Sequence, residues 1–283
     1  MRGVLPPGMS RLVCAAMLLA ATAAACSEGA TPRAASPEVG AAAEKSPAAA
    51  AAQAVKSMQD VTSLRYGLTG TVVLTGHVDA EVAMTTQPWA MSMEVTAERG
   101  TAWRGPTEFR FIKDIMYVKN GTSRRGQNSS KRWTSAAPGV WGRGAVENRS
   151  FGLLPSELSM NPITQSTLLT ASKDLRRTGT ATVDGTSTTR YSGTVVSDAV
   201  EGDRLDQLVG LWVTGTLTTD MWIDDSGHLK QYRLRGEHAP NTVPAGAGGP
   251  LDLTITFHSI DQALTIKPPA RNDTTFLGDA RQG

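Results

Sequence analysis

Apolar and polar residues alternate in several short runs of the chain, and this spacing predicts strands with one buried face. The clearest run is 251–258, in which every second residue is apolar and the others are Asp, Thr and His. The same alternation occurs within 66–74, 89–95 and 217–223. Each of these runs therefore predicts a strand with one apolar face and one face toward water.

Short turn signals separate the predicted strands. Asp184-Gly185 and the segment 224–227 each lie between two such runs, and Asn120-Gly121 follows the apolar run 116–118. Asp, Asn, Ser and Gly tolerate the left-handed backbone of tight hairpin turns. We therefore predict hairpins and a mostly antiparallel sheet.

Helical spacing of apolar residues is found in three segments. Residues 53–61, 162–173 and 200–211 are predicted to form short amphipathic helices. Two further segments are predicted to be loops: 126–144, which is rich in Gly, Ser and Arg, and 238–250, which is rich in Gly, Pro and Ala. The expected fold class is α+β, with a long curved antiparallel sheet and a few short helices packed on its concave side.

The N-terminal segment has the features of a lipoprotein signal peptide. It carries Arg2 and Arg11, an apolar run over 12–21, and small residues that lead to Cys26. Signal peptidases cleave after small residues, and the sulfur of a lipoprotein Cys carries a diacylglyceryl group. The apolar run is too short for a membrane span, which needs about 20 residues. We predict a signal peptide over 1–25 and a lipid anchor on Cys26, at the extracytoplasmic face of the bacterial cell membrane.

A plain secretory signal is the alternative for this segment. Position 23 is Ala, where lipoprotein signals more often carry Leu, and Cys26 would then be incidental. The other cysteine, Cys14, lies within the apolar run and leaves with the signal peptide on either interpretation.

The exported part carries no net charge. Removal of the signal peptide takes away two Arg and no acid, which leaves 26 basic and 26 acidic residues. Because phosphate binding draws on a basic excess, no nucleic-acid partner is expected.

Without a disulfide, the domain must be held by its core alone. Residues 26–50, dominated by Ala, Pro, Ser, Glu and Gly, are predicted to be a flexible tether, residues 51–270 the folded domain, and residues 271–283 a flexible tail.

Several runs resemble a known family. Two features carry the resemblance: the run 116–119 with the later 131–133, and the segment 184–193 followed by a helix and by 221–224. The family is that of the actinobacterial LppX/LprG-type lipoproteins. These lipoproteins are similar in fold to the LolA and LolB lipoprotein carriers. The resemblance covers about residues 51–268. It implies a half-barrel of antiparallel strands wrapped around helices, an apolar cavity for acyl chains, and no shared catalytic residues.

No catalytic or metal-binding pattern is present in the sequence. The four His residues are far apart, and no thiolate remains once Cys26 is acylated, so a zinc site is not expected. No Gly-x-Ser-x-Gly motif occurs, and the Gly-rich segment 246–250 lacks the Lys-Ser/Thr of a phosphate loop. We expect no enzyme activity, no metal and no cofactor; an enzyme of cell-envelope metabolism is kept as a rival hypothesis.

The candidate binding residues are apolar positions of the predicted strands and helices. The ten Met residues would suit a surface that accommodates variable apolar ligands, although Met also fills irregular cores. The predicted cavity wall comprises Val72, Leu74, Met91, Met93, Leu169, Leu208, Leu211, Met221, Leu253, Ile255 and Phe257. The predicted cavity mouth comprises Trp133, Trp141 and Phe151, for which packing within loops is the alternative role.

The leading hypothesis is a membrane-anchored, non-catalytic carrier that binds a lipid, glycolipid or acyl group in this cavity. We expect a monomer, and a membrane transporter is left open as a further partner. The alternative is a surface interaction or regulatory lipoprotein that has a filled core and a protein partner.

Substitution Cys26→Ser tests the anchor. Because Ser has no sulfur to carry the lipid, the variant is expected to lose palmitate labelling and to leave the membrane fraction of the cell. A Cys26→Ser variant that still incorporates labelled palmitate would show that the anchor lies elsewhere.

Overall fold

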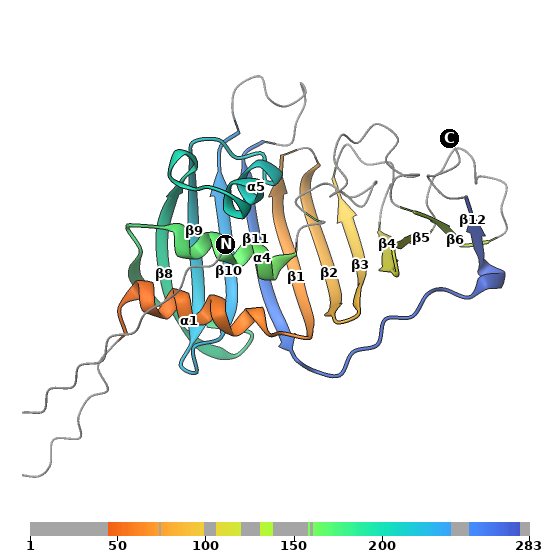
Figure 1. Ribbon diagram of the computed structural model, residues 1–283, viewed down its shortest axis with the longest axis horizontal. Coiled ribbons are helices and arrows are strands. Elements are labelled where there is room, and N and C mark those ends of the chain that lie inside the picture. Colours follow the sequence, from red (N-terminus) through yellow and green to blue (C-terminus); the bar gives the residue numbers. More distant parts are fainter. Residues whose placement is uncertain are drawn as a thin grey trace, which may run out of the picture. The chain divides into compact units, whose positions relative to one another are not determined.

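The computed structural model describes residues 45–73, 75–98, 106–119, 131–137, 158, 161–238 and 249–277. Their main feature is one twelve-stranded sheet, in the order β12-β6-β5-β4-β3-β2-β1-β11-β10-β9-β8-β7 (Figure 1). The strands are β1 (Ser63–Val72), β2 (Gly76–Thr86), β3 (Trp89–Ala97), β4 (Thr107–Ile112), β5 (Ile115–Lys119), β6 (Trp133–Ala136), β7 (Arg176–Val183), β8 (Thr186–Val196), β9 (Thr216–Asp224), β10 (Leu229–Gly236), β11 (Leu251–Ile260) and β12 (Thr274–Phe276).

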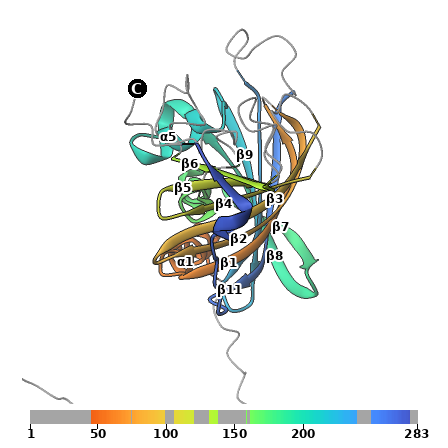
Figure 2. The same cartoon turned by 90° about the vertical axis from the view of Figure 1, so that its right-hand side faces the viewer.

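Neighbouring strands of the sheet are antiparallel, apart from the parallel pair of β12 with β6. The pairing of β1 with β11 joins the early strands β1 to β6 to the later strands β7 to β11. Figure 2 shows the strands curving around the side on which helices α1 (Pro47–Gln59) and α5 (Asp203–Gly210) lie. The predicted fold class, an open curved antiparallel sheet with a few short helices, is confirmed.

The alternating runs form strands whose apolar positions are buried. In β11 the four odd-numbered residues from Leu251 to Phe257 are at most 2% exposed, whereas His258 is exposed. In β9 every second residue from Leu217 to Ile223 is likewise buried, and Asp220 and Trp222 on the opposite face are buried as well. One face of the sheet, which we call the apolar face, is therefore buried; the opposite one, which carries most of the polar side chains, is called the polar face.

Two of the predicted hairpins are present. The β7–β8 turn places Asp184 and Gly185 at φ 45° and 74°, and the β9–β10 turn places Gly227 at φ 86°. The hairpin between β4 and β5 was not predicted. Its turn residues Lys113 and Asp114 adopt φ 51° and 59°, and Lys is not typical of such a turn. Asn120-Gly121 lies outside the described residues.

The first helix begins earlier than the sequence predicts. Helix α1 starts at Pro47, not at residue 53, so the predicted tether 26–50 is wrong for its last residues. Ser46 caps the helix by accepting a hydrogen bond from the Ala49 amide, and Pro at the first helical position suits the helical backbone. The small side chains of Ala50, Ala51 and Ala54 are buried, which lets this end of the helix pack closely.

The other helices lie near the predicted segments. Residues 162–173 contain α4 (Pro162–Ser166) followed by a 3-10 helix, η1 (Thr167–Ala171). Together with α1 and α5 they lie over the part of the sheet formed by β1, β11, β10, β9 and β8 (Figure 1). Short 3-10 helices also occur at Ser197–Ala199 (η2) and Arg271–Asp273 (η3).

Two segments predicted to lack regular structure contribute strands. Residues Trp133–Ala136 within the predicted loop 126–144 form β6, and residues 274–276 within the predicted tail 271–283 form β12 beside it. Arg132 donates to the Asp273 carboxylate through both its amide and its side chain, at 2.9 and 2.8 Å. These contacts between distant parts of the chain order both segments, and alternation over so few residues could not reveal them.

A buried carboxylate ties three strands together on the polar face. Asp220 on β9 is fully buried and accepts hydrogen bonds from Arg190 on β8 at 3.0 Å and from Arg235 on β10 at 2.7 Å. The Ser192 hydroxyl donates to the same carboxylate. Because a buried charge is stable only when it is paired, this group fixes the relative positions of β8, β9 and β10.

Substitution Asp220→Ala is expected to lower the free energy of unfolding by about 3 kcal/mol, because it leaves two guanidinium groups without their carboxylate. Asp252→Ala is the matched control, since Asp252 pairs with Arg233 on the same face but is about two fifths exposed. The control should cost below about 1 kcal/mol. Equal losses in urea unfolding of the two variants would contradict this account of Asp220.

Candidate functional site

The apolar face continues across the sheet in rows of side chains from paired strands. One row runs through Tyr191, Met221, Tyr232, Ile255, Leu68, Ala80 and Val95, on β8, β9, β10, β11, β1, β2 and β3. All seven residues are buried. The pairing of β1 with β11 therefore makes one uninterrupted apolar surface from strands of both halves of the chain.

Two further rows extend this surface over β2 to β5. The first contains Leu64, Met84, Met91, Phe111 and Met116, and the second contains Tyr66, Val82, Met93, Phe109 and Val118. Each residue is at most 7% exposed. Four Met side chains thus lie on this part of the face, where flexible thioethers can adapt to the shape of what covers them.

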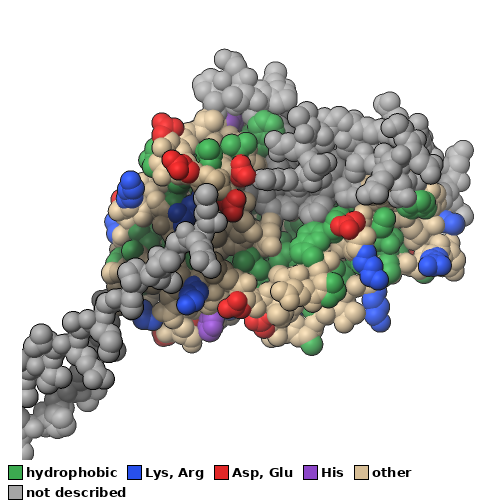
Figure 3. All heavy atoms as spheres, viewed as in Figure 1, with side chains coloured by type: hydrophobic (Ala, Val, Ile, Leu, Met, Phe, Trp, Pro, Cys, Tyr) green, Lys and Arg blue, Asp and Glu red, His purple; other side chains and the backbone are tan. Residues whose placement is uncertain are grey.

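Figure 3 views the side of the molecule that carries the helices. Apolar side chains gather in the middle of this view, and Lys, Arg, Asp and Glu side chains lie over its left-hand part, along its lower edge and at its right. Helix α1 packs on β9 and β10, and η1 packs on β8 and β9. The apolar face thus extends sideways, along the Met-rich rows of β2 to β5, beyond the strands that these helices contact.

The structure brings the described cavity-wall candidates into one core. Each is at most 3% exposed, and those on strands share the apolar face, while those on helices and turns pack against it. These residues are Val72, Met91, Met93, Leu169, Leu208, Leu211, Met221, Leu253, Ile255 and Phe257. Leu74 lies outside the described residues, and the assignment of all eleven to a ligand cavity stays a prediction.

Of the three cavity-mouth candidates, the structure describes Trp133. Trp133 is paired with Lys119 across β5 and β6 and lies on the polar face, where the Arg110 guanidinium stands 4.8 Å from its ring centroid. Trp133 is only 5% exposed, so stacking under cationic side chains explains its position and places it away from the predicted cavity wall. Trp141 and Phe151 lie outside the described residues.

Sequence reasoning missed part of the apolar face. Phe109 and Phe111 alternate with polar residues in β4, a signal that could have identified this strand, but the run is only six residues long. For helix α5 the prediction placed too many residues in the core, because its apolar residues do not all face the sheet. Leu208 is buried, whereas Leu205 and Val209 are 39% and 59% exposed.

Three aromatic rings occupy the middle of the apolar face. Phe257 on β11 lies between Tyr66 on β1 and Tyr232 on β10, with ring centroids 6.2 and 6.0 Å apart. The Tyr232 hydroxyl donates to the side-chain oxygen of Gln165, a buried residue of α4. This hydrogen bond connects the helix layer to the sheet at a point that is otherwise apolar.

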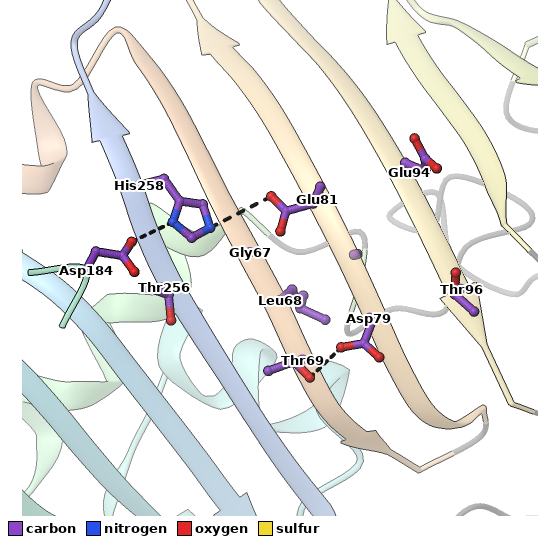
Figure 4. A pocket seen from close by; sticks show the side chains of 11 residues that line it. Gly67, Leu68, Thr69, Asp79, Glu81, Glu94, Thr96, Asp184, Thr256 and His258 are labelled. Atoms are coloured by element: carbon purple, nitrogen blue, oxygen red, sulfur yellow. Dashed lines mark hydrogen bonds and ion pairs between the residues drawn. The ribbon is translucent and has the colours of Figure 1, made fainter.

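The polar face carries a groove of about 590 Å³ over β11, β1, β2 and β3 (Figure 4). In it the His258 ring lies between Asp184 of the β7–β8 turn, at 2.6 Å, and Glu81, at 3.8 Å. Gly67 makes room for the ring, because a Cβ there would lie 2.9 Å from His258 Nε2. The groove is lined by carboxylates and hydroxyls. Its paired side chains form their hydrogen bonds and ion pairs with one another.

The described residues contain no cluster of three or more His, Cys, Asp or Glu side chains that could hold a metal ion. Nor does any helix of the described ranges have the length and apolar character needed to cross a membrane.

Substitution Tyr232→Phe is expected to loosen α4, because the helix loses its hydrogen bond to the sheet and leaves Gln165 buried with one partner fewer. The cost to the free energy of unfolding should be about 1–2 kcal/mol. Hydrogen exchange of the amides in residues 162–171 should accelerate more than that of β9 and β10. Uniform acceleration across these segments would contradict a local role of the bond.

Comparisons with known proteins agree with the fold. Residues 160–266 match the sequence model of the LppX_LprAFG lipoprotein family. An uncharacterized 31.2 kDa protein from the rplA-rplJ intergenic region of Streptomyces griseus is 25% identical over 197 residues, which are 63% of this chain. The match spans 59% of the length of that relative, less than two thirds.

A solved structure agrees at the level of fold. The crystal structure of LprF from Mycobacterium bovis has a TM-score of 0.52 and 16% identity, over 79% of this chain and 97% of LprF. For the lipoprotein LppX from Mycobacterium tuberculosis the TM-score is 0.48 with 18% identity, over 78% of this chain and 98% of LppX. The resemblance predicted from the sequence is confirmed: the protein is similar to the LppX/LprG-type lipoproteins in fold and, over residues 160–266, in sequence.

Proposed function

We propose that the protein binds the acyl chains of a lipid or glycolipid against the apolar face of its sheet and carries them without making or breaking a bond. The observation that carries this proposal is the continuity of that face over β8 to β5, with four Met residues on β2, β3 and β5. The residues of this face are at most 8% exposed without a ligand, so an acyl chain, which has matching length and chemistry, would take the place of apolar contacts that now cover the face.

Burial energetics favour this kind of ligand. Each buried CH₂ group contributes about 0.8 kcal/mol, so one long acyl chain could supply on the order of 10 kcal/mol before the costs of ordering are subtracted. The Met side chains at positions 84, 91, 93 and 116 can adjust their rotamers to chains of different length or branching. A set of lipids, as distinct from one rigid molecule, is therefore the ligand class that fits this surface.

The proposed setting is the cell envelope. Lipid anchoring through Cys26 would keep the domain at the membrane surface, and residues 27–46 would give it reach. Extended chain spans up to about 3.5 Å per residue, so this segment could place the domain several nanometres from its anchor. A carrier held in this way would contact the bilayer surface repeatedly. A membrane transporter is the class of partner with which it would exchange lipid.

A matched pair of double variants tests lipid binding. Met84 and Met91 are directly paired on the apolar face, and Ala83 and Ser92 are paired beside them on the polar face. Met84→Ser with Met91→Ser should lower lipid uptake by the full-length protein about tenfold, because two apolar contacts are lost. Ala83→Ser with Ser92→Ala should leave uptake unchanged.

Uptake is measured with radiolabelled diacylglycerol delivered from cyclodextrin to immobilised protein. Thermal unfolding of each variant controls for loss of structure. If the wild-type protein takes up no lipid, the carrier function is wrong, and the filled-core interaction lipoprotein becomes the better account. If it takes up lipid but the Met pair has no effect, the lipid binds elsewhere.

A further inference from the structure

The tip of the β7–β8 hairpin contacts the polar face through a histidine of β11. His258 Nδ1 lies 2.6 Å from a carboxylate oxygen of Asp184 in the hairpin turn, and His258 Nε2 lies 3.8 Å from a carboxylate oxygen of Glu81 on β2. In the sheet, β9 and β10 separate β8 from β11. The histidine therefore connects the turn to a strand with which neither strand of the hairpin pairs.

The hairpin itself is an exposed part of the domain. Strand β7 is an edge strand of the sheet, and its residues 176–180 are all exposed, whereas Val183 beside the turn is buried. Figure 2 shows the β7–β8 hairpin projecting from the sheet on the side away from α1 and α5. The buried part of β7 is thus its tip, beside the contact of Asp184 with His258.

The two ring nitrogens of His258 face two carboxylates. A neutral imidazole has one N–H and can donate to one of them, while its other nitrogen presents a lone pair. A protonated imidazole has an N–H on both nitrogens and attracts both carboxylates. Gly67 on β1 makes room for this arrangement, because a Cβ there would lie 2.9 Å from His258 Nε2 and 3.3 Å from Glu81 Oε1.

The surroundings of the ring are mostly acidic. The charged groups that line the groove and a smaller hollow beside it are Asp79, Glu81, Glu94, Glu108, Asp184 and Arg65. On β10, Lys230 is next to Gln231, which pairs with Thr256. Glu81 and Glu94 are direct partners across β2 and β3, and like charges in such positions repel each other. A positive charge on the His258 ring would reduce this repulsion.

We propose that His258 is a pH-sensitive latch for the β7–β8 hairpin. The protonated ring attracts Asp184 and Glu81 together and holds the hairpin tip against β11 and β2. As the pH rises, the ring loses its charge, the attraction to Glu81 ends, and the tip is held by one hydrogen bond from a neutral ring. Because Asp184 lines the groove of the polar face, release of the tip opens one wall of that groove. The latch lies on the face opposite the proposed lipid surface, so it can be tested without lipid.

Hydrogen exchange of the full-length protein tests the latch. Exchange is measured at about pH 5.5 and about pH 8, on either side of the range in which histidine changes its charge, and is corrected for the intrinsic rate at each pH. Protection of the amides in residues 180–189 should fall about threefold between the two conditions, which corresponds to the strength of an exposed ion pair. Protection of the amides of β3 should stay unchanged.

Two variants and a control locate the effect. His258→Gln cannot gain a charge, so its hairpin should show the lower protection at both pH values. Asp184→Asn should behave in the same way, and Asn tolerates the φ of 45° that this turn position requires. His77→Gln is the control, because His77 pairs with Asp79 of its own strand at 3.1 Å, and it should keep the wild-type dependence on pH.

Two results would overturn the latch. One is a wild-type hairpin whose protection does not change between these pH values. The other is a change that persists in His258→Gln. The wild-type measurement decides the matter even if a variant unfolds, and a change of equal size in β3 would show that pH acts on the whole domain and so would also count against the latch.

Discussion

The pairing of β1 with β11 is the constraint on which the rest of the structure depends. It joins strands from opposite ends of the domain, with Tyr66 beside Phe257 and Leu68 beside Ile255, and so places the apolar residues of both halves on one surface. Without that pairing, β1 to β6 with β12 would form one smaller sheet and β7 to β11 another, each with an apolar face of its own. With it, the single surface is wider than the part that α1 and η1 contact.

The two faces of the sheet are stabilised by different interactions. On the polar face, charged side chains pair across neighbouring strands, and the buried Asp220 with its two arginines fixes β8, β9 and β10. On the apolar face, hydrophobic contacts predominate, and the hydrogen bond between Tyr232 and Gln165 is a polar contact that positions a helix. Strong, specific pairing on one face lets the other remain apolar and adaptable.

The sequence predicted those elements that local pattern determines. Strict alternation identified β11, β9 and β3, and Asp-Gly chemistry identified the β7–β8 hairpin. Features set by distant contacts were missed. Strand β12 has three residues and exists because it pairs with β6. Trp133 was expected at a cavity mouth. Its actual place under Arg110 depends on how β4, β5 and β6 align, which the sequence does not show. The hydrogen bond between Tyr232 and Gln165 depends on where α4 lies over the sheet, and no local pattern shows that.

The central claim is that the apolar face holds lipid, and native mass spectrometry of the full-length protein purified from bacterial cells tests it most directly. The account predicts a complex whose added mass corresponds to about one acyl lipid or glycolipid, which is released on unfolding and identified by its long acyl chains. Protein that is folded and carries no lipid, and that takes up none when lipid is offered, would contradict it.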